Sequence, residues 1–192
     1  MLVFGHVGIA LGATKLLSGL LGSKRISKAA EGETANPPLL RKSRLDIRFL
    51  LIGSLLPDII DKPIGLYFFR ETFSNGRIFC HTLLFLILVT VIGLYFYKRS
   101  GKTWALALSL GIFFHLTLDQ MWLTPQTLLW PLFGLDFKRV DLSDWVTNIF
   151  QALLTEPAVY LPELIGAAIL IWFTWTLLYR KKTRAFLKYG KS

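Results

Sequence analysis

The stretch LDIRFLLIGSLLPDIID, residues 45–61, joins an apolar run to a pair of carboxylates. The run LDIRFLLIGSLL is typical of a membrane helix, yet Asp58 and Asp61 follow it directly and stand between Pro57 and Pro63. A charged side chain inside a bilayer costs about 2.5–3.5 kcal/mol on insertion scales. The two aspartates are therefore expected to have a partner, or a chemical task, within the protein.

The composition of the whole chain is that of a helical membrane protein. Of its 192 residues 53% are hydrophobic and 14% aromatic, which is unlike a soluble globular domain. The single cysteine, Cys80, excludes an internal disulfide and a cysteine-based zinc site. The net charge of +10 lies in the connections between apolar stretches, which indicates membrane orientation and not nucleic-acid binding. We expect an all-α fold, a polytopic membrane bundle that forms one domain over residues 1–192.

Five apolar stretches are long enough, or nearly so, to cross a hydrocarbon core of ~30 Å as a helix. They are residues 2–22, 46–61, 79–97, 103–123 and 159–179. The second is short, and Pro63 is expected to stop it. The first lacks the basic start and the small-residue cleavage site of a signal peptide, so we predict an uncleaved span.

The other segments are predicted as connections. Residues 124–157 are too broken by Pro and Gly for a plain span and too apolar for full solvation, which indicates a re-entrant or interfacial segment with a short amphipathic helix from about Ser143. Lys and Arg concentrate in residues 23–45, 98–102 and 180–192, and the positive-inside rule makes that side cytoplasmic. The predicted N-terminus is outside, residues 23–45 form a flexible loop, and 180–192 form a basic tail.

The polar residues of these spans all fall near the predicted outer ends. They are His6, Asp58, Asp61, His81, His115 and Asp119, and they include all three histidines of the chain. His115 and Asp119 are at i and i+4, which places both on one helix face, and the i, i+3 pair of Asp58 and Asp61 shares a face if the turn is helical.

Imidazole nitrogens and carboxylate oxygens are the ligands that zinc and other divalent first-row metals prefer. We therefore predict that the six residues bind one or two divalent ions, with zinc as the first choice. A single tetrahedral ion would leave a carboxylate over, so Asp58, Asp61 and Asp119 are also the candidates for a general base or an orienting group. Polar clamps between helices, a helix cap at Asp58 or an ion pair from Asp61 to Lys62 or Arg77 would explain single residues, but not their convergence at one depth.

Four cations on the same side are candidates for binding an anionic substrate group: Lys62, Arg77, Lys138 and Arg139. Arg77 stands four residues before His81 and is expected on the same helix face. Cys80 is expected to pack and not to react, and Glu163 is expected to start a helix or, alternatively, to join the site.

The ordered set of His6, GSLLPDIID, the run from Arg77 to Thr82, and HLTLD resembles the YdjM-like, LexA-regulated inner-membrane proteins, which are described as membrane-bound metal-dependent hydrolases. The resemblance covers roughly residues 1–135. It implies an inner-membrane location and a functional role for the six His and Asp residues. The long basic first connection and residues 136–192 depart from it.

These observations predict a metal-dependent hydrolase that faces the periplasmic side and attacks a lipid or lipid-linked substrate with activated water. A lipid phosphoester is the first choice, and a lipid amide or ester, cleaved as ceramidases do, is the second. A metal or proton transporter and a structural protein with a polar packing cluster are the alternatives from other classes. Covalent serine catalysis is not expected, because no GxSxG motif is present. No oligomeric state is predicted.

Overall fold

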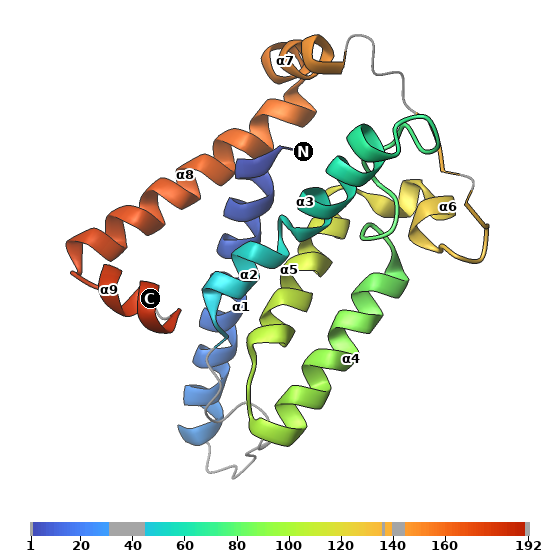
Figure 1. The fold of residues 1–192 in the computed structure, drawn as a ribbon. Helices are drawn as coiled ribbons and strands as arrows, with labels where there is room; N and C mark the ends of the chain where they lie inside the picture. Colours follow the sequence, from blue (N-terminus) through green and yellow to red (C-terminus); the bar gives the residue numbers. More distant parts are fainter. Residues whose placement is uncertain (1, 31–44, 136, 140–144, 191–192) are drawn as a thin grey trace.

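A computed structural model describes residues 2–30, 45–135, 137–139 and 145–190. Within these ranges the chain is helical or irregular and contains no strand, which confirms the all-α expectation. Figure 1 shows the elements. In chain order they are α1 (Val3–Ala30), α2 (Ile47–Gly53), α3 (Leu56–Lys62), the π-helix η2 (Pro63–Phe68), α4 (Leu83–Ser100), α5 (Trp104–Leu118), the 3₁₀-helix η3 (Met121–Leu123), α6 (Pro125–Leu128), α7 (Trp145–Thr155), α8 (Pro157–Tyr179) and α9 (Thr183–Tyr189).

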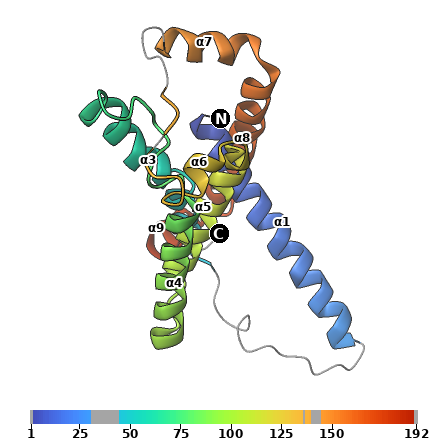
Figure 2. The same cartoon turned by 90° about the vertical axis from the view of Figure 1, so that its right-hand side faces the viewer.

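Two of the described helices, α4 and α8, are long and apolar enough to cross a membrane, and shorter apolar helices cover Val3–Gly19 and Trp104–Leu118. The count of five spans therefore stays a prediction. The first helix continues to Ala30, past the predicted end at residue 22, because the intervening KRISKAA holds neither Gly nor Pro. Figure 2 shows this second half of α1 running away from the other helices. The rest of the predicted flexible loop, residues 31–44, lies outside the described residues.

The helices approach one another closely at glycines. A Cβ on Gly8 of α1 would meet the backbone of Gly166 in α8, and one on Gly166 would meet the carbonyl of Phe4. On the other side of the bundle, Gly53 of α2 faces the carbonyl of Leu108 in α5. Small residues allow this backbone approach between membrane helices. The two contacts bring α1, α2, α5 and α8 close enough for short side chains to meet across them.

The predicted second span is a helix with one break. Ser54 and Leu55 separate α2 from α3, and α3 begins with Pro57 in its first turn. Pro63 was expected to end the helix, and this expectation is wrong: its backbone is helical, with φ −60° and ψ −42°, and the chain continues through η2. A proline at the junction of an α- and a π-segment removes a donor where the bonding pattern changes. The helical arm thus extends to Phe68.

The third predicted span begins later than residue 79. Thr82 has an extended backbone and its hydroxyl accepts a hydrogen bond from the Phe85 N–H at 3.1 Å, so it is the N-cap of α4. His81 and Arg77 consequently lie in the loop before α4 and do not share a helix face. The predicted shared helix face of Arg77 and His81 is therefore wrong, because the Thr82 cap leaves residues 77–82 outside the helix.

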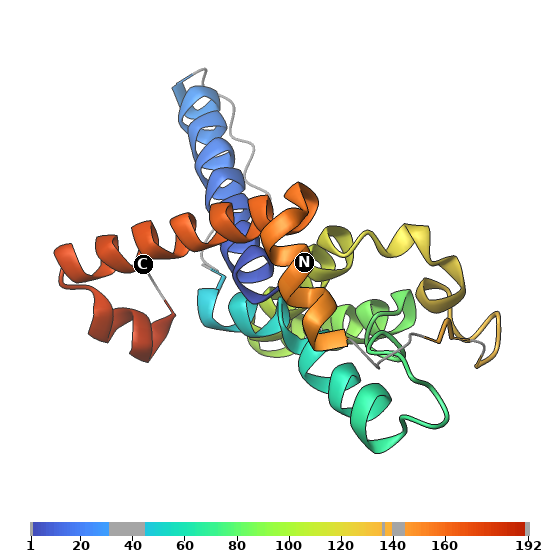
Figure 3. The ribbon, with the colours of Figure 1, turned by 90° about the horizontal axis from the view of Figure 1, so that it is seen from above.

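The last third of the chain adds short helices and the long helix α8 to the bundle. Within 124–157 the structure has α6 and α7, and α7 lies across the start of α8 (Figure 1); the proposed cap Ser143 lies outside the described residues. The basic tail is partly helical: α9 turns back so that the Leu187 carbonyl accepts a hydrogen bond from Arg48 at 2.6 Å. Figure 3 shows α8 and α9 on one side of the molecule and α6 on the other.

Candidate metal centre

Four residues from four segments bring ligand atoms together inside the bundle. Asp58 comes from α3, His81 from the loop before α4, His115 from α5, and Asp119 from the residue after α5. One ligand atom from each lies within 4.8 Å of all the others, so this group could hold a metal ion. Both imidazoles are fully buried, and the two carboxylates are mostly so.

The distances between these atoms suit a small ion. The two Nε2 atoms are 3.1 Å apart, and Asp58 Oδ1 lies 3.5 Å from Nε2 of His81 and 3.9 Å from Nε2 of His115. Asp119 Oδ2 lies 3.9 Å and 3.8 Å from the same two nitrogens. Ligand atoms about 2.0–2.2 Å from a tetrahedral ion are roughly 3.3–3.6 Å from one another. The cluster therefore needs only small shifts to complete an N₂O₂ coordination shell.

The hydrogen bonds behind the imidazoles fix which nitrogen faces the centre. His115 Nδ1 lies 2.8 Å from the Ser54 carbonyl, which only accepts, so Nδ1 carries the proton. His81 Nδ1 lies 2.7 Å from Asp61 Oδ2. The Asp61 carboxylate also accepts backbone N–H groups at the end of this loop, from Ile78, Cys80 and His81. Three backbone N–H groups thus already donate to this carboxylate, whose oxygens accept, so we assign the proton of His81 to Nδ1 as well.

As a result, two neutral imidazoles would point unprotonated Nε2 lone pairs at each other across 3.1 Å. Such an arrangement is repulsive unless a proton or a cation lies between the nitrogens. Two adjacent carboxylates add negative charge, which favours a divalent ion over a single proton. The donor set and the orientation of both imidazoles thus fit a metal centre.

Asp61 and His6 adjoin the group of four without belonging to it. Asp61 is fully buried and stands behind His81, the position from which carboxylates orient metal-binding histidines. His6 of α1 contacts Asp119 Oδ1 through Nε2 at 3.1 Å, and its ring stacks on His115 with centroids 4.2 Å apart. The structure therefore gathers all six predicted residues, four at the centre and two beside it.

Two of the four predicted cations touch the cluster. Lys62 Nζ lies 2.6 Å from Asp58 Oδ2 and Arg77 Nε lies 2.9 Å from Asp119 Oδ2. Their side chains are 39% and 43% exposed, so each links a buried carboxylate to the surface. The other two make contacts elsewhere: Asn75 Nδ2 donates to the Lys138 carbonyl, and Arg139 donates to the Thr72 carbonyl.

Glu163 of α8 has a role that the sequence did not indicate. Its carboxylate, 7% exposed, accepts the backbone N–H groups of Leu2, Phe4 and Gly5 at 2.7, 2.9 and 3.1 Å. It caps the free donors at the start of α1 and so fixes the turn that carries His6. The acid in YLPELIG was the only signal, and nothing local pairs it with residues 2–5.

A helical membrane protein with a buried histidine–aspartate centre is the class that this fold and site define. The model of the family described as YdjM inner membrane protein matches residues 1–187, and the chain belongs to that family. The match extends well beyond residue 135 and includes α7, α8 and α9. No match was found among curated proteins or among solved structures.

Proposed function

We propose that this protein is a membrane-embedded, metal-dependent hydrolase that acts on an amphiphilic substrate at the outer leaflet. The observation that carries the proposal is the pair of buried imidazoles whose Nε2 atoms face each other at 3.1 Å, with a carboxylate oxygen of Asp58 and of Asp119 within 4 Å of both. A divalent ion held by these four residues, zinc as first choice, would have to bind a water in addition to the four side chains; it would then lower the pKa of that water and polarise a substrate oxygen.

The side chains around this group divide into three tasks. Asp61 and the Ser54 carbonyl hold the two imidazoles in the tautomer that presents Nε2. Asp58 and Asp119 each have one oxygen toward the histidines and are the residues placed to take a proton from water. Asp61 is fully engaged by four donors, so we assign it to orientation and not to proton transfer.

Lys62 and Arg77 supply the substrate specificity in this proposal. Each is bound to one carboxylate of the centre and is partly exposed, which is how a cation can hold an anionic group next to the reacting bond. This favours a lipid phosphoester. An amide or ester bond of a lipid, which needs no anion site, is the second choice.

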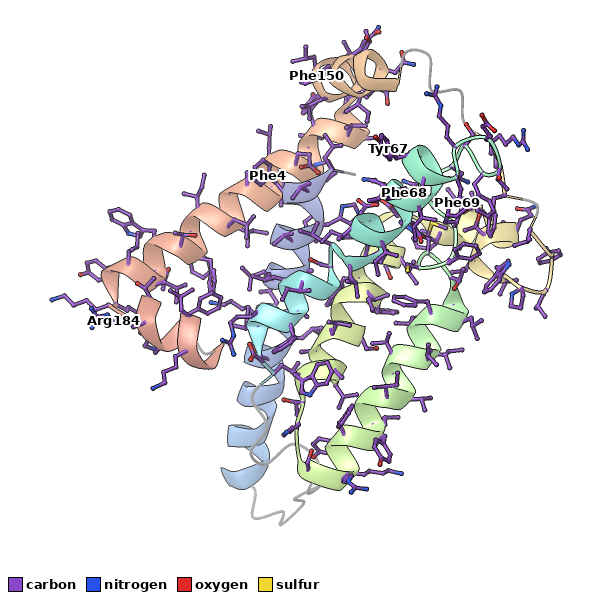
Figure 4. All side chains as sticks on the ribbon, viewed as in Figure 1. Phe4, Tyr67, Phe68, Phe69, Phe150 and Arg184 are labelled. Carbon is purple, nitrogen blue, oxygen red and sulfur yellow. The ribbon has the colours of Figure 1, made fainter. Side chains whose placement is uncertain are left out.

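Aromatic side chains near the centre support an amphiphilic substrate. Phe4 stands two residues before His6, and Tyr67 and Phe68 lie on η2 directly after the arm that carries Asp58; all three are exposed and lie at the same end of the bundle (Figure 4). They offer apolar surface beside a polar site. A soluble substrate would gain nothing from it.

A transport path through the same cluster is less well supported. Directly beyond the centre, Gly53 and Gly111 hold the backbones of α2 and α5 in contact, with Gly111 against the Leu50 carbonyl and Gly53 against the Leu108 carbonyl. Close backbone packing leaves no room for a continuing row of polar ligands between these helices. We therefore favour a site that ends within the bundle.

The test begins with the metal content of the purified full chain, measured by elemental analysis beside His115→Ala and Asp58→Ala. Ser109→Ala is the matched control, because Ser109 is a buried polar residue of the same helix that pairs with Thr90 instead, at 2.6 Å. We expect one or two equivalents in the wild type and the control, and loss in both site variants. Equal metal content in all four proteins would contradict the proposal.

The reaction is then tested with the metal supplied. A phosphatidate and a ceramide with identical acyl chains are offered in mixed micelles, and release of inorganic phosphate and of fatty acid is measured. Phosphate release that is absent in His115→Ala supports the first choice, and fatty-acid release alone supports the second. Release of neither from a metal-loaded protein would remove the hydrolase assignment and favour transport.

A further inference from the structure

We infer that the end of the bundle opposite the metal centre binds the phosphate of an anionic phospholipid between Lys15 of α1 and the residues Arg180 and Lys182 that follow α8. This inference does not depend on the proposed function, because it uses neither the metal centre nor its cations.

The position of Lys15 follows from the packing of α1 on α8. The two helices run in the same direction: Gly8 meets Gly166 and Gly12 meets Ile169, and Leu11 packs with Phe173 and Leu177 in one apolar cluster. Lys15 comes one turn after Leu11, so it reaches α8 just beyond this cluster. Its Nζ lies 4.3 Å from the ring centroid of Phe173 and 5.7 Å from that of Trp172.

Two more cations stand at this point. Arg180 is the C-cap of α8, one turn after Thr176, and the N–H of Lys182 bonds back to the Leu177 carbonyl at 2.9 Å. Both side chains are exposed, and both follow Phe173, the ring that Lys15 contacts, by about two to three helical turns. A cation near a helix C-terminus interacts favourably with the free carbonyl groups there. This would explain one cation at the end of α8, but not three like charges, Lys15, Arg180 and Lys182, in one place.

The described carboxylates do not neutralise this group. Asp46, the described acid at this end, is bound by Arg48, with Nη2 2.7 Å from Oδ2. The other described acids lie at the opposite end, in the centre or beside α7 and η2: Asp58, Asp61, Glu71, Asp119, Glu156 and Glu163. The local excess of positive charge is therefore complementary to an anion from outside the described chain.

The surroundings select a lipid as the source of that anion. Trp172, Trp175 and Tyr179 are exposed on α8, and an aromatic belt of this kind lies at the level of lipid headgroups. Exposed Ile171 continues the apolar surface toward the middle of α8, where acyl chains can lie. Basic groups between membrane helices are a known mode of anionic headgroup recognition. Arg184 on α9 points away from the bundle (Figure 4) and is not needed for this contact.

The experiment uses the full chain purified in a neutral detergent. Phosphatidylglycerol or phosphatidylcholine with the same acyl chains is added, and the midpoint of thermal unfolding and the number of retained lipids are measured, the latter by native mass spectrometry. The site variant is Lys15→Gln with Lys182→Gln. The matched control is Lys98→Gln with Lys102→Gln, which removes the same charge from exposed positions in the last turn of α4 and in its connection to α5.

We expect phosphatidylglycerol, but not phosphatidylcholine, to raise the unfolding midpoint of the wild type and the control. In the site variant the apparent dissociation constant for phosphatidylglycerol should rise by about tenfold or more. If the double variant does not fold, Lys182→Gln alone, at an exposed position, should show a smaller rise of a few-fold. Equal responses of site and control variants, or of the two lipids, would overturn the inference. Equal protection by inorganic phosphate would also overturn it, because the site would then bind a free anion.

Discussion

Arg77 and Asp119 are joined through the one carboxylate oxygen that also faces both histidines. Nε of Arg77 lies 2.9 Å from Oδ2 of Asp119, and the same oxygen lies 3.8 Å and 3.9 Å from the two Nε2 atoms. A guanidinium on this oxygen neutralises part of the charge that would attract a divalent ion. The arginine thus competes with the metal while it provides the anion contact for a substrate.

Replacing Arg77 should separate these two effects. We expect Arg77→Gln to bind zinc several-fold more tightly than the wild type in a competition titration with a chromogenic chelator, because the competing cation is removed. The same variant should hold an anionic substrate or product less well. Arg70→Gln, an exposed cation of the neighbouring turn, controls for net charge and should leave zinc affinity unchanged. Weaker zinc binding in Arg77→Gln would show that the arginine orders Asp119 instead.

Asp61→Asn tests the orienting role of Asp61. An amide offers one acceptor oxygen where the carboxylate now receives four donors, so His81 should lose its fixed tautomer. We expect metal affinity to fall by about 10–100-fold, the range for outer partners of metal-binding histidines, whereas Asp58→Asn should abolish binding at the same metal concentration. Unchanged affinity in Asp61→Asn would exclude the role.

Glu163→Gln tests the link between the two ends of the chain. The substitution leaves backbone donors of Leu2, Phe4 or Gly5 without an ionised acceptor, which is expected to lower the free energy of unfolding by about 1–3 kcal/mol. Thermal or denaturant unfolding in detergent measures this change. Glu156→Gln is the control, because Glu156 is exposed and makes no side-chain cap to α8. A loss of stability in the control as large as in Glu163→Gln would contradict the capping role.

Gly8→Ala tests the approach of α1 to α8. The added Cβ would overlap the Gly166 backbone, so the helices must separate and His6 must move from Asp119. We expect a lower unfolding midpoint together with weaker metal binding. Gly19→Ala, in the same helix with nothing within 4 Å of the added atom, should be neutral or slightly stabilising. Equal unfolding midpoints and equal metal binding in the two alanine variants would show that the close approach of α1 to α8 contributes to neither.

The sequence correctly predicted which residues come together at the site. It was less successful in predicting the local structure that carries each of them. Regular spacing correctly related His115 to Asp119 because both are held by one helical turn, with the Asp119 N–H bonded to the His115 carbonyl. The same reasoning failed for His81, because the Thr82 cap places it in a loop. All three histidines nevertheless lie near the predicted outer ends of their apolar stretches, and this shared position correctly predicted that they meet.

The two contacts that sequence patterns missed have a common physical cause. Glu163 bonds to residues about 160 positions away, and Arg77 reaches Asp119 from a loop without regular periodicity. Both depend on how α1, α8 and the residues before α4 pack, which no local spacing records. Helix limits at Pro63 and Ala30 also differed, because neighbouring segments decide whether a helix continues.

The contact of Glu163 with the first turn of α1 has a consequence for how the protein is made. Asp58, His81, His115 and Asp119 have all been synthesised before α8, whereas His6 is the first of the six to leave the ribosome and depends on Glu163, the last contributor. A nascent chain that ends before α8 holds all four residues of the group but lacks the carboxylate that caps the start of α1. We therefore expect assembly in two steps, in which the four ligands gather first and His6 is fixed only after Glu163 of α8 is in place.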